Sequence, residues 1–461
     1  MTFAGDMGGS ALDSLAKALP PGALLTDPDL IEGYRFDRSN AAHAGKPVAV
    51  VRTTCTSDVQ ETLRWASANR IPVVPRGAGT GLAGGSLAVD GCVVLSTEKM
   101  RAITIDPPAG LAVVQPGALN AEVKASARAH GLWYPPDPSS FEICSIGGNV
   151  ATNAGGLCCV KYGVTTDYVL GIEVVLADGR ALRLGGRTIK DVAGYDLKRL
   201  FVGSEGTLGV VTEATLRLRP LPPPAVTMVA TFADVGSAGR AISTIAAQGR
   251  PAALELMDQT SVQAVEARMH MGLEKQCGAL LLGQSDAGGD RAAGEVEAMV
   301  AACQAEGALD VAWTDDESEG EQFMVARRMA IPAVEALGTV LIEDVGVPIP
   351  QIAELVRGVE RVADRCETTI ATIGHAGDGN FHPLVVFDRS DERAVERAER
   401  AFGEVMELAL ALGGTITGEH GVGSLKRPWL AQRVGDDVMA ITRQIKSIFD
   451  PLGILNPGKA L

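Results

Sequence analysis

The stretch PRGAGTGLAGGS, residues 75–86, decides how the N-terminal half of the chain is interpreted. It places five glycines within residues 77–85, directly after IPVVP, which is predicted to be a buried strand. Glycine permits positive φ angles and a close approach of the backbone to a ligand. Successive exposed N–H groups can form a nest that binds phosphate. A mobile glycine loop is the alternative, but this density of glycine beside Arg76 favours a pyrophosphate cradle.

The same stretch also matches the dinucleotide fingerprint GxGxxG at Gly79, Gly81 and Gly84. That fingerprint requires a helix straight after the loop. Here a Val-Asp-Gly turn leads instead into CVVLS at residues 92–96, which is predicted to be a strand. The sequence therefore argues against a Rossmann fold.

Two further glycine-rich segments follow. SIGGNVATNAGG, residues 145–156, mixes paired glycines with Ser, Asn and Thr, which offer the donors and acceptors that a polar heterocycle needs. Such a composition is also typical of simple turns. GSEGTLGVVT, residues 203–212, again places small residues before a predicted strand.

Around these segments, the chain divides into two parts. Residues 1–43 are predicted to be a helical lead-in, and strands with few long helices follow up to the proline cluster PLPPP at 220–224, which suits a domain boundary. Strands alternate with helices over 225–360, which indicates an α+β domain. Helices are predicted at 390–412 and 428–449, and the C-terminal end is predicted to be irregular.

Bulk properties exclude several classes of protein. The net charge of −15 disfavours nucleic-acid binding. No run of apolar residues reaches the roughly 18 of a membrane span, and the N-terminus lacks the apolar region of a signal peptide. The eight cysteines form no CxxC pattern, so structural thiols in a reduced, cytoplasmic setting are expected.

Three of the six histidines fall in two short motifs, GHAGDGNFH at 374–382 and TGEHGVG at 417–423. AGDGN is predicted to be a turn that brings His375 and His382 to one point. Two imidazoles and a carboxylate form a catalytic metal set with open positions for a substrate. Isolated histidines in polar loops usually only donate hydrogen bonds, but this clustering beside Glu419 favours a functional site.

Together, the three glycine segments resemble the FAD-linked oxidases of the vanillyl-alcohol-oxidase type. PRGAGTGLAGGS, GGNVATNAGG and GSEGTLGVVTEATLRL are similar to the branch of D-lactate dehydrogenase, the glycolate oxidase flavin subunit and D-2-hydroxyglutarate dehydrogenase. The resemblance covers roughly residues 45–461. It implies an α+β fold: a two-subdomain FAD-binding domain over 1–222 (helices 1–43, core 44–222), an α+β substrate-side domain over 223–412, and a segment, 413–461, that returns to the flavin.

The resemblance also implies where FAD is held. Members whose flavin is covalently bound through the first loop carry a histidine where this chain has Thr80, so non-covalent FAD is expected. The implied FAD-binding residues are Arg76, Gly77, Gly79, Thr80, Gly81, Gly84, Gly85, Ser86, Pro136, Asp137, Ser140, Gly147, Gly148, Asn149, Thr152, Asn153, Gly155, Gly156, Glu205, Gly209, Val210, Val211 and Asn456.

The resemblance further implies a divalent metal, zinc or manganese, held by His375, His382 and Glu419, with His420 as the catalytic base. Arg327 matches the family arginine that grips the substrate carboxylate, a task that suits a planar guanidinium. The neighbouring Arg328 is expected to be solvated.

The substrate is expected to be a small monocarboxylic D-2-hydroxy acid of the lactate or glycolate kind. Ile331, Ile342 and Leu384 stand where the hydroxyglutarate branch places polar residues for a second carboxylate. Two rivals stay open: a same-fold enzyme with no net redox outcome, of the ether-lipid synthase type, and a flavin subunit that only relays electrons. An iron–sulfur partner subunit, a homodimer and a peripheral membrane association through a partner are compatible with the resemblance. The sequence alone does not identify the hydroxy acid, the metal or the electron acceptor.

Overall fold

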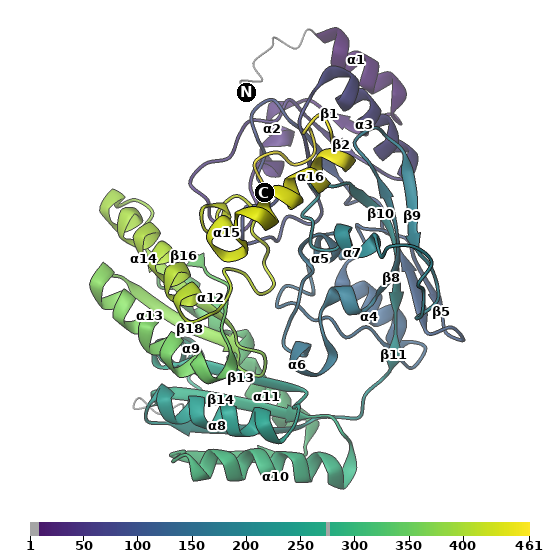
Figure 1. The fold of residues 1–461 in the computed structure, drawn as a ribbon. Helices are drawn as coiled ribbons and strands as arrows, with labels where there is room; N and C mark the ends of the chain where they lie inside the picture. The colour runs from purple at the N-terminus through teal and green to yellow at the C-terminus, as the bar shows by residue number, and fades with distance from the viewer. Residues whose placement is uncertain (1–8, 273–276) are drawn as a thin grey trace. The chain divides into compact units, whose positions relative to one another are not determined.

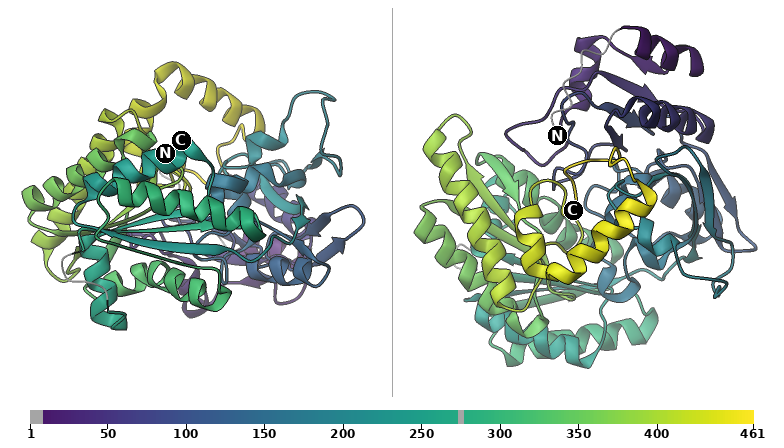
Figure 2. Two further views of the ribbon diagram at one scale, coloured as in Figure 1. Left: turned by 90° about the horizontal axis from the view of Figure 1, so that it is seen from below. Right: turned by 45° about the horizontal axis from the view of Figure 1, so that its top comes forward.

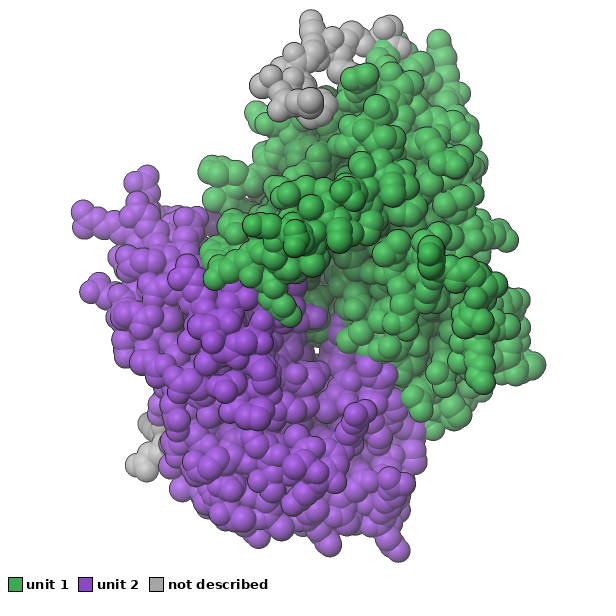
Figure 3. Space-filling model, in the orientation of Figure 1, with its two compact units in different colours: residues 1–154, 164–221, 419–461 green, residues 155–163, 222–418 purple. Residues whose placement is uncertain are grey.

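The computed structural model describes residues 9–272 and 277–461, which form two compact units. Unit 1 comprises residues 1–154, 164–221 and 419–461, and unit 2 comprises 155–163 and 222–418 (Figure 3). The chain thus enters unit 2 within the proline cluster at 220–224. It returns to unit 1 after Gly418, six residues later than the sequence analysis placed that crossing.

Unit 1 is built on two sheets (Figure 1). The first has the order β1-β2-β4-β3, in which β2, β4 and β3 run parallel, and the second is antiparallel with the order β5-β6-β10-β8-β9. Their strands, with the short pair β7 and β11, are β1 (Leu24–Leu25), β2 (Ala49–Arg52), β3 (Val73–Arg76), β4 (Val93–Ser96), β5 (Ile103–Asp106), β6 (Leu111–Val114), β7 (Leu132–Trp133), β8 (Val169–Val175), β9 (Ala181–Gly185), β10 (Val210–Arg217) and β11 (Arg219–Pro220).

The alternation of buried and partly exposed residues shows which face of a strand is turned toward the core. In β10 every second residue, from Val210 to Leu216, is buried, which matches the period of two in a strand with one face toward a core. The helices that accompany the sheets are α1 (Gly9–Ala18), α2 (Pro28–Ile31), α3 (Thr56–Asn69), α4 (Asn120–Arg128), α5 (Ile146–Thr152), α7 (Lys198–Phe201), α15 (Arg427–Val434) and α16 (Asp436–Phe449).

Unit 2 contains one antiparallel sheet with the order β15-β12-β14-β13-β18-β19-β16, and β17 pairs with β19. Its strands are β12 (Val226–Phe232), β13 (Ala253–Asp258), β14 (Ala279–Ser285), β15 (Asp310–Thr314), β16 (Thr339–Ile342), β17 (Val345–Gly346), β18 (Thr369–His375) and β19 (Asn380–Phe387). Every residue of β13 is buried, so this strand lies in the interior of the unit.

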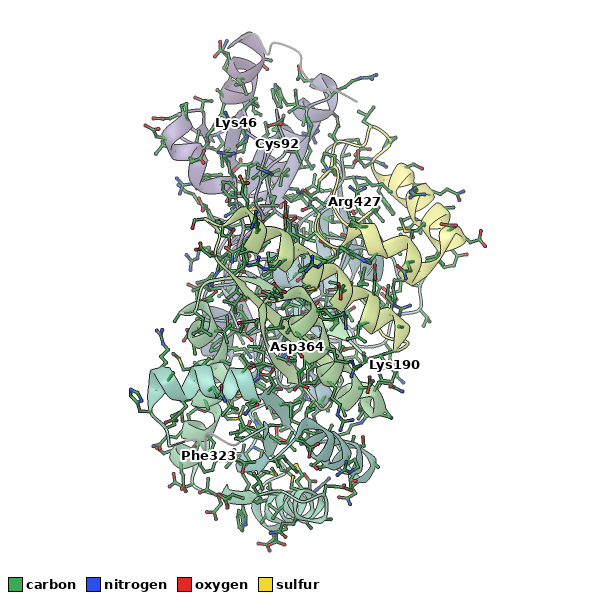
Figure 4. The ribbon with its side chains drawn as sticks, turned by 90° about the vertical axis from the view of Figure 1, so that its left-hand side faces the viewer. Lys46, Cys92, Lys190, Phe323, Asp364 and Arg427 are labelled. Atoms are coloured by element: carbon green, nitrogen blue, oxygen red, sulfur yellow. The ribbon has the colours of Figure 1, made fainter. Side chains whose placement is uncertain are left out.

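Two groups of helices pack on this sheet (Figure 2). One group consists of α8 (Val235–Gln248), α10 (Gly289–Ala305), α13 (Ile352–Cys366) and α14 (Glu392–Ala411). These helices contact one another and strands β12, β14, β18 and β19. The other consists of α9 (Gln259–Met269), α11 (Glu317–Arg328) and α12 (Ala330–Glu335). Phe323 on α11 and Asp364 on α13 mark the two groups in Figure 4.

Unit 2 also includes the short segment 155–163, with helix α6 (Cys159–Tyr162), although its chain neighbours belong to unit 1. Lys161 forms an ion pair with Asp286, and the Tyr162 hydroxyl donates to the same carboxylate. Because the Asp286 side chain is nearly buried, these contacts anchor the segment to the end of β14.

The structure confirms most of the predicted elements. The strands expected at IPVVP and CVVLS are β3 and β4, and no helix separates them. The helical structure predicted over 428–449 is confirmed as two helices, α15 and α16, which Gly435 separates with φ +86°. The turn interpretation of 145–156 is wrong over Ile146–Thr152, which forms helix α5 with Ser145 as its N-cap.

The eight cysteines, all within the described residues, are thiols that form no disulfide bond. Across residues 9–272 and 277–461, no helix combines the length and apolar character needed to cross a membrane.

Candidate functional site

The glycine loop of unit 1 packs directly against the cap of helix α5. A Cβ atom on Gly77 would lie 2.3 Å from Ser145 Oγ. That hydroxyl accepts hydrogen bonds from the backbone N–H groups of Ala78, at 3.2 Å, and Gly148, at 3.4 Å. The first two glycine segments, 67 residues apart in the chain, therefore form one structure, and glycine at position 77 is what permits their contact.

Arg76 lies inside the curve of the same loop. Gly79 has φ +73°, and a Cβ atom there would lie 2.1 Å from Arg76 Nη2. Burial lowers the pKa of the Arg76 guanidinium, an effect that the nearby Asp37 carboxylate opposes. Within the described residues, no protein acceptor takes the N–H groups of Gly77, Gly79 or Gly81. A cation beside several available N–H groups is the donor set that a pyrophosphate requires.

Glu205 and Asn456 join the glycine loop to the C-terminal segment. The buried Glu205 carboxylate accepts from the N–H groups of Val422 and Gly423, both at 2.8 Å. Burial raises the pKa of this carboxyl group, and the two N–H donors oppose that shift. Asn456 Nδ2 donates to Gly85 O at 2.9 Å and to Glu205 O at 2.7 Å. Together these bonds fix the loop that follows His420 to the glycine cradle.

The other expected FAD-binding residues are divided between the two units. Those at 76–86, 136–153, 205–211 and 456 lie in unit 1, whereas Gly155 and Gly156 lie in unit 2. Asn149 is buried, and its side chain is engaged by Asn120, at 3.1 Å, and by Cys144 Sγ, at 3.3 Å. Gly147 packs against Pro116, since a Cβ atom there would lie 2.5 Å from the proline Cβ.

In unit 2, strands β18 and β19 form a hairpin that brings two of the predicted metal ligands together. His375 pairs with Asn380 and His382 pairs with Ile373, so both histidines lie on one face of the sheet as diagonal neighbours. Their ring centroids are 5.2 Å apart with the planes at 83°, and each offers a nitrogen within 4.8 Å of the other's. The turn predicted at AGDGN is thus confirmed at residues 376–379.

Both imidazoles are held through Nδ1. His375 Nδ1 lies 2.8 and 3.0 Å from the two carboxylate oxygens of Glu255, which is directly opposite on β13. His382 Nδ1 lies 3.3 Å from the backbone oxygen of Glu343. Since carboxylate and carbonyl oxygens only accept, each Nδ1 carries a proton, and Nε2 is the nitrogen of each ring that can coordinate a metal. This donor set fits a divalent metal.

Arg327 reaches the same cluster from the last turn of α11. Its Nε donates to Glu255 Oε2 at 2.8 Å, and its side chain is 3% exposed. Its Nη2 is buried and has no hydrogen-bond partner among the described residues. Arg328 differs, as expected, because it is exposed and paired with Glu321. Arg327 therefore presents an unused donor in the interior, which suits a ligand carboxylate.

The third predicted ligand, Glu419, and the predicted base, His420, begin the last segment of unit 1. The preceding residues belong to unit 2: Thr417 Oγ1 and the Gly418 N–H donate to Asp344 Oδ2, at 2.6 and 2.9 Å. Asp344 therefore fixes the point from which Glu419 emerges. Sequence reasoning missed both Asp344 and Glu255; an acidic residue between two leucines in the strand ALELMD was the available signal for Glu255.

Comparison with known proteins agrees with this architecture. Residues 47–185 match the family described as FAD binding domain, and residues 221–460 match FAD linked oxidases, C-terminal domain. The chain belongs to the FAD-linked oxidase family. FAD is accordingly the cofactor of this FAD-linked oxidase.

Relatives of this FAD-linked oxidase match over almost their whole length. It is 42% identical to "Glycolate oxidase subunit GlcD" of Bacillus subtilis, over 92% of this chain and 91% of that protein. It is 35% identical to "D-lactate dehydrogenase" of Archaeoglobus fulgidus, over 98% of each.

Solved structures confirm the vanillyl-alcohol-oxidase type of fold. A p-cresol methylhydroxylase with substrate bound matches 98% of this chain and 96% of its own, with a TM-score of 0.84 and 18% identity. An alkyldihydroxyacetonephosphate synthase matches 99% and 86%, with a TM-score of 0.77 and 17% identity. At these identities the likeness concerns the fold alone.

Substitution of Gly77 tests the cradle. Gly77→Ala places a methyl group 2.3 Å from Ser145 Oγ and displaces the hydroxyl from its two N–H donors. Losing two hydrogen bonds of ~1 kcal/mol each predicts FAD binding weakened by about tenfold or more. The measurement is fluorescence titration of the apoprotein with FAD. Gly33→Ala is the control, because a Cβ atom there meets nothing within 4 Å. Equal FAD affinity in both variants would show that residues 77–81 do not hold the cofactor.

Proposed function

We propose that this FAD-linked oxidase oxidises a small D-2-hydroxy monocarboxylate, of the lactate or glycolate kind, to the 2-keto acid. The observation that carries the proposal is the buried cluster of unit 2, where Glu255 binds His375 and Arg327, and Arg327 Nη2 has no hydrogen-bond partner among the described residues. His382 lies on the same face of the sheet as the diagonal neighbour of His375. Relatives named glycolate oxidase subunit and D-lactate dehydrogenase support the same substrate class.

The cofactors follow from the residues available. FAD is bound non-covalently, because Thr80 occupies the position from which family members with a linked flavin supply histidine. A divalent metal, zinc or manganese, would be held by Nε2 of His375 and His382 and by the Glu419 carboxylate. The metal would supply polarisation of the α-hydroxyl group, which lowers its pKa, and FAD would supply the acceptor of the hydride from the α-carbon.

The chain's own residues perform the remaining tasks. Arg327 binds the substrate carboxylate through the guanidinium edge that Glu255 leaves unused. His420 accepts the hydroxyl proton as a general base. Glu419 and His420 are adjacent, with Glu419 Oε1 and His420 Nε2 3.8 Å apart, so one short loop supplies both a ligand and a base.

An apolar boundary sets the size of the acid. Ile342 on β16 and Leu384 on β19 are paired directly and are almost fully buried. The third residue, Ile331, lies on α12. None of these side chains can bond to a second carboxylate, which favours lactate or glycolate over hydroxyglutarate.

Electrons must then leave the reduced flavin. No cysteine pattern for a cluster occurs in this chain. Since two relatives are named subunits, transfer to a partner protein, such as an iron–sulfur subunit, is the route proposed here.

Anaerobic flavin reduction tests the function and the substrate class. D-Lactate or glycolate should bleach the flavin, with a kcat/KM at least about tenfold above that for D-2-hydroxyglutarate. The reason is that an unpaired carboxylate in an apolar site costs several kcal/mol, and about 1.4 kcal/mol is a factor of ten. L-Lactate is the stereochemical control. Flavin that stays oxidised with every hydroxy acid refutes the activity, and a preference for hydroxyglutarate refutes the apolar boundary.

The adjacent pair Glu419 and His420 should separate metal binding from base catalysis. His375→Ala, His382→Ala and Glu419→Gln are each expected to lower the metal content. His420→Asn should retain metal and FAD but slow flavin reduction by about a hundred- to ten-thousandfold, with residual activity that rises at high pH. Elemental analysis paired with stopped-flow reduction of all four variants measures both properties. Loss of metal from His420→Asn would show that His420 is a metal ligand. Wild-type protein that contains no divalent metal would refute the metal site.

A further inference from the structure

Glu255 is a charged residue in the middle of a strand whose other residues, except the terminal Asp258, are apolar. It lies on β13, with Leu254 before it and Leu256 after it, and its side chain is 0% exposed. A buried carboxylate without partners costs several kcal/mol, so such a residue persists only where neighbours neutralise it. A structural role alone could be filled by an apolar side chain of similar volume, since replacing buried ion pairs in this way is often neutral or stabilising.

The two hydrogen-bond donors to the Glu255 carboxylate, of which Arg327 carries the compensating charge, come from two separate elements. Arg327 Nε, from α11, donates to Oε2 at 2.8 Å. His375 Nδ1, from β18, lies 2.8 Å from Oε1 and 3.0 Å from Oε2. Register explains the second contact, because Glu255 and His375 are directly paired on adjacent antiparallel strands. One carboxylate thus bridges a guanidinium 72 residues later in the chain and an imidazole 120 residues later.

Each contact determines what the partner can offer elsewhere. The carboxylate retains the proton of His375 on Nδ1 and so leaves Nε2 as a lone-pair donor on the side of His382. The same carboxylate occupies Arg327 Nε and fixes the plane of the guanidinium, while the buried Nη2 has no partner among the described residues. The orientation of both groups therefore depends on one side chain.

We propose that Glu255 is a positioning residue that aligns the carboxylate-binding Arg327 and the metal-binding His375 as one rigid array. This inference rests on the proposed function, because that function assigns the two ends of the array. Its specific consequence is that a single substitution at residue 255 weakens the binding of metal and of the hydroxy acid together, although the side chain touches neither.

The test compares three variants in the full-length holoprotein. Glu255→Gln keeps the size of the side chain but presents an N–H₂ group to one of two donors, which disrupts one contact or both. Glu255→Asp keeps the charge on a shorter stem and is the conservative rescue. Glu321→Gln is the matched control, because Glu321 pairs with the neighbouring, exposed Arg328.

Two equilibrium measurements are made besides turnover. The first is the Zn²⁺ dissociation constant, from competition with a chelator. The second is the dissociation constant of oxalate, a non-oxidisable carboxylate, from the change that it causes in the flavin spectrum. Glu255→Gln is expected to weaken Zn²⁺ binding by about ten- to a hundredfold, the usual effect of removing a carboxylate behind a metal-bound histidine. It should also weaken oxalate by about tenfold or more and raise KM. Glu255→Asp should recover part of both losses, and Glu321→Gln should leave both constants unchanged.

FAD content and the thermal midpoint show whether each variant is folded. If Glu255→Gln is not folded, the smaller loss of affinity expected for Glu255→Asp is measured instead. Unchanged Zn²⁺ and oxalate affinity in a folded Glu255 variant overturns the proposal, and so does loss of one affinity alone. If no hydroxy acid reduces wild-type flavin, yet Glu255→Gln still loses both affinities, the proposed function fails and the positioning role stands. If a hydroxy acid does reduce the wild-type flavin but a folded Glu255→Gln keeps both affinities, the proposed function stands and the positioning role of Glu255 is refuted.

Discussion

A carboxylate excluded from water must be neutralised by its neighbours, and the arrangement of unit 2 around Glu255 follows from that constraint. The residue is 0% exposed, and its two oxygens are shared between Arg327 and His375. The pairing of β13 with β18 brings the imidazole into reach, and the last turn of α11 supplies the guanidinium. Since breaking one partner of a buried pair costs several kcal/mol, these elements are held in one relative position.

Steric closeness plays the corresponding part in the glycine loop of unit 1, the proposed site of the FAD pyrophosphate. The loop at 77–81 can lie against Ser145 only because residue 77 has no Cβ, and Arg76 fits within the loop for the same reason at Gly79. A backbone packed this tightly presents N–H groups rather than side chains to the ligand. The glycine loop thus depends on the absence of Cβ atoms at Gly77 and Gly79, whereas the cluster of unit 2 depends on the charges of Glu255 and Arg327.

Much of this was predictable from the sequence, and the failures have physical causes. Periodicity identified the strands and the long helices, and the spacing of GHAGDGNFH identified the histidine hairpin. Helix α5 was missed because Gly147 and Gly148 have poor helix propensity; the Ser145 cap and the burial of Ile146 and Val150 outweigh it. Glu255 was missed because its partners lie 72 and 120 residues away, and periodicity does not reveal which strands are neighbours. Its charge in an apolar run was the only signal.

The most direct test of the central claim is a crystal structure of the protein loaded with Zn²⁺ and a 2-keto acid, with anomalous data collected at the zinc edge. The proposed arrangement of His375 and His382 predicts one anomalous peak at about 2.0–2.1 Å from Nε2 of each histidine. It also predicts the ligand carboxylate on Nη2 of Arg327, with Glu255 still bonded to both partners. Zinc bonded through Nδ1, a peak remote from these histidines, or a carboxylate that does not contact Arg327 would contradict it.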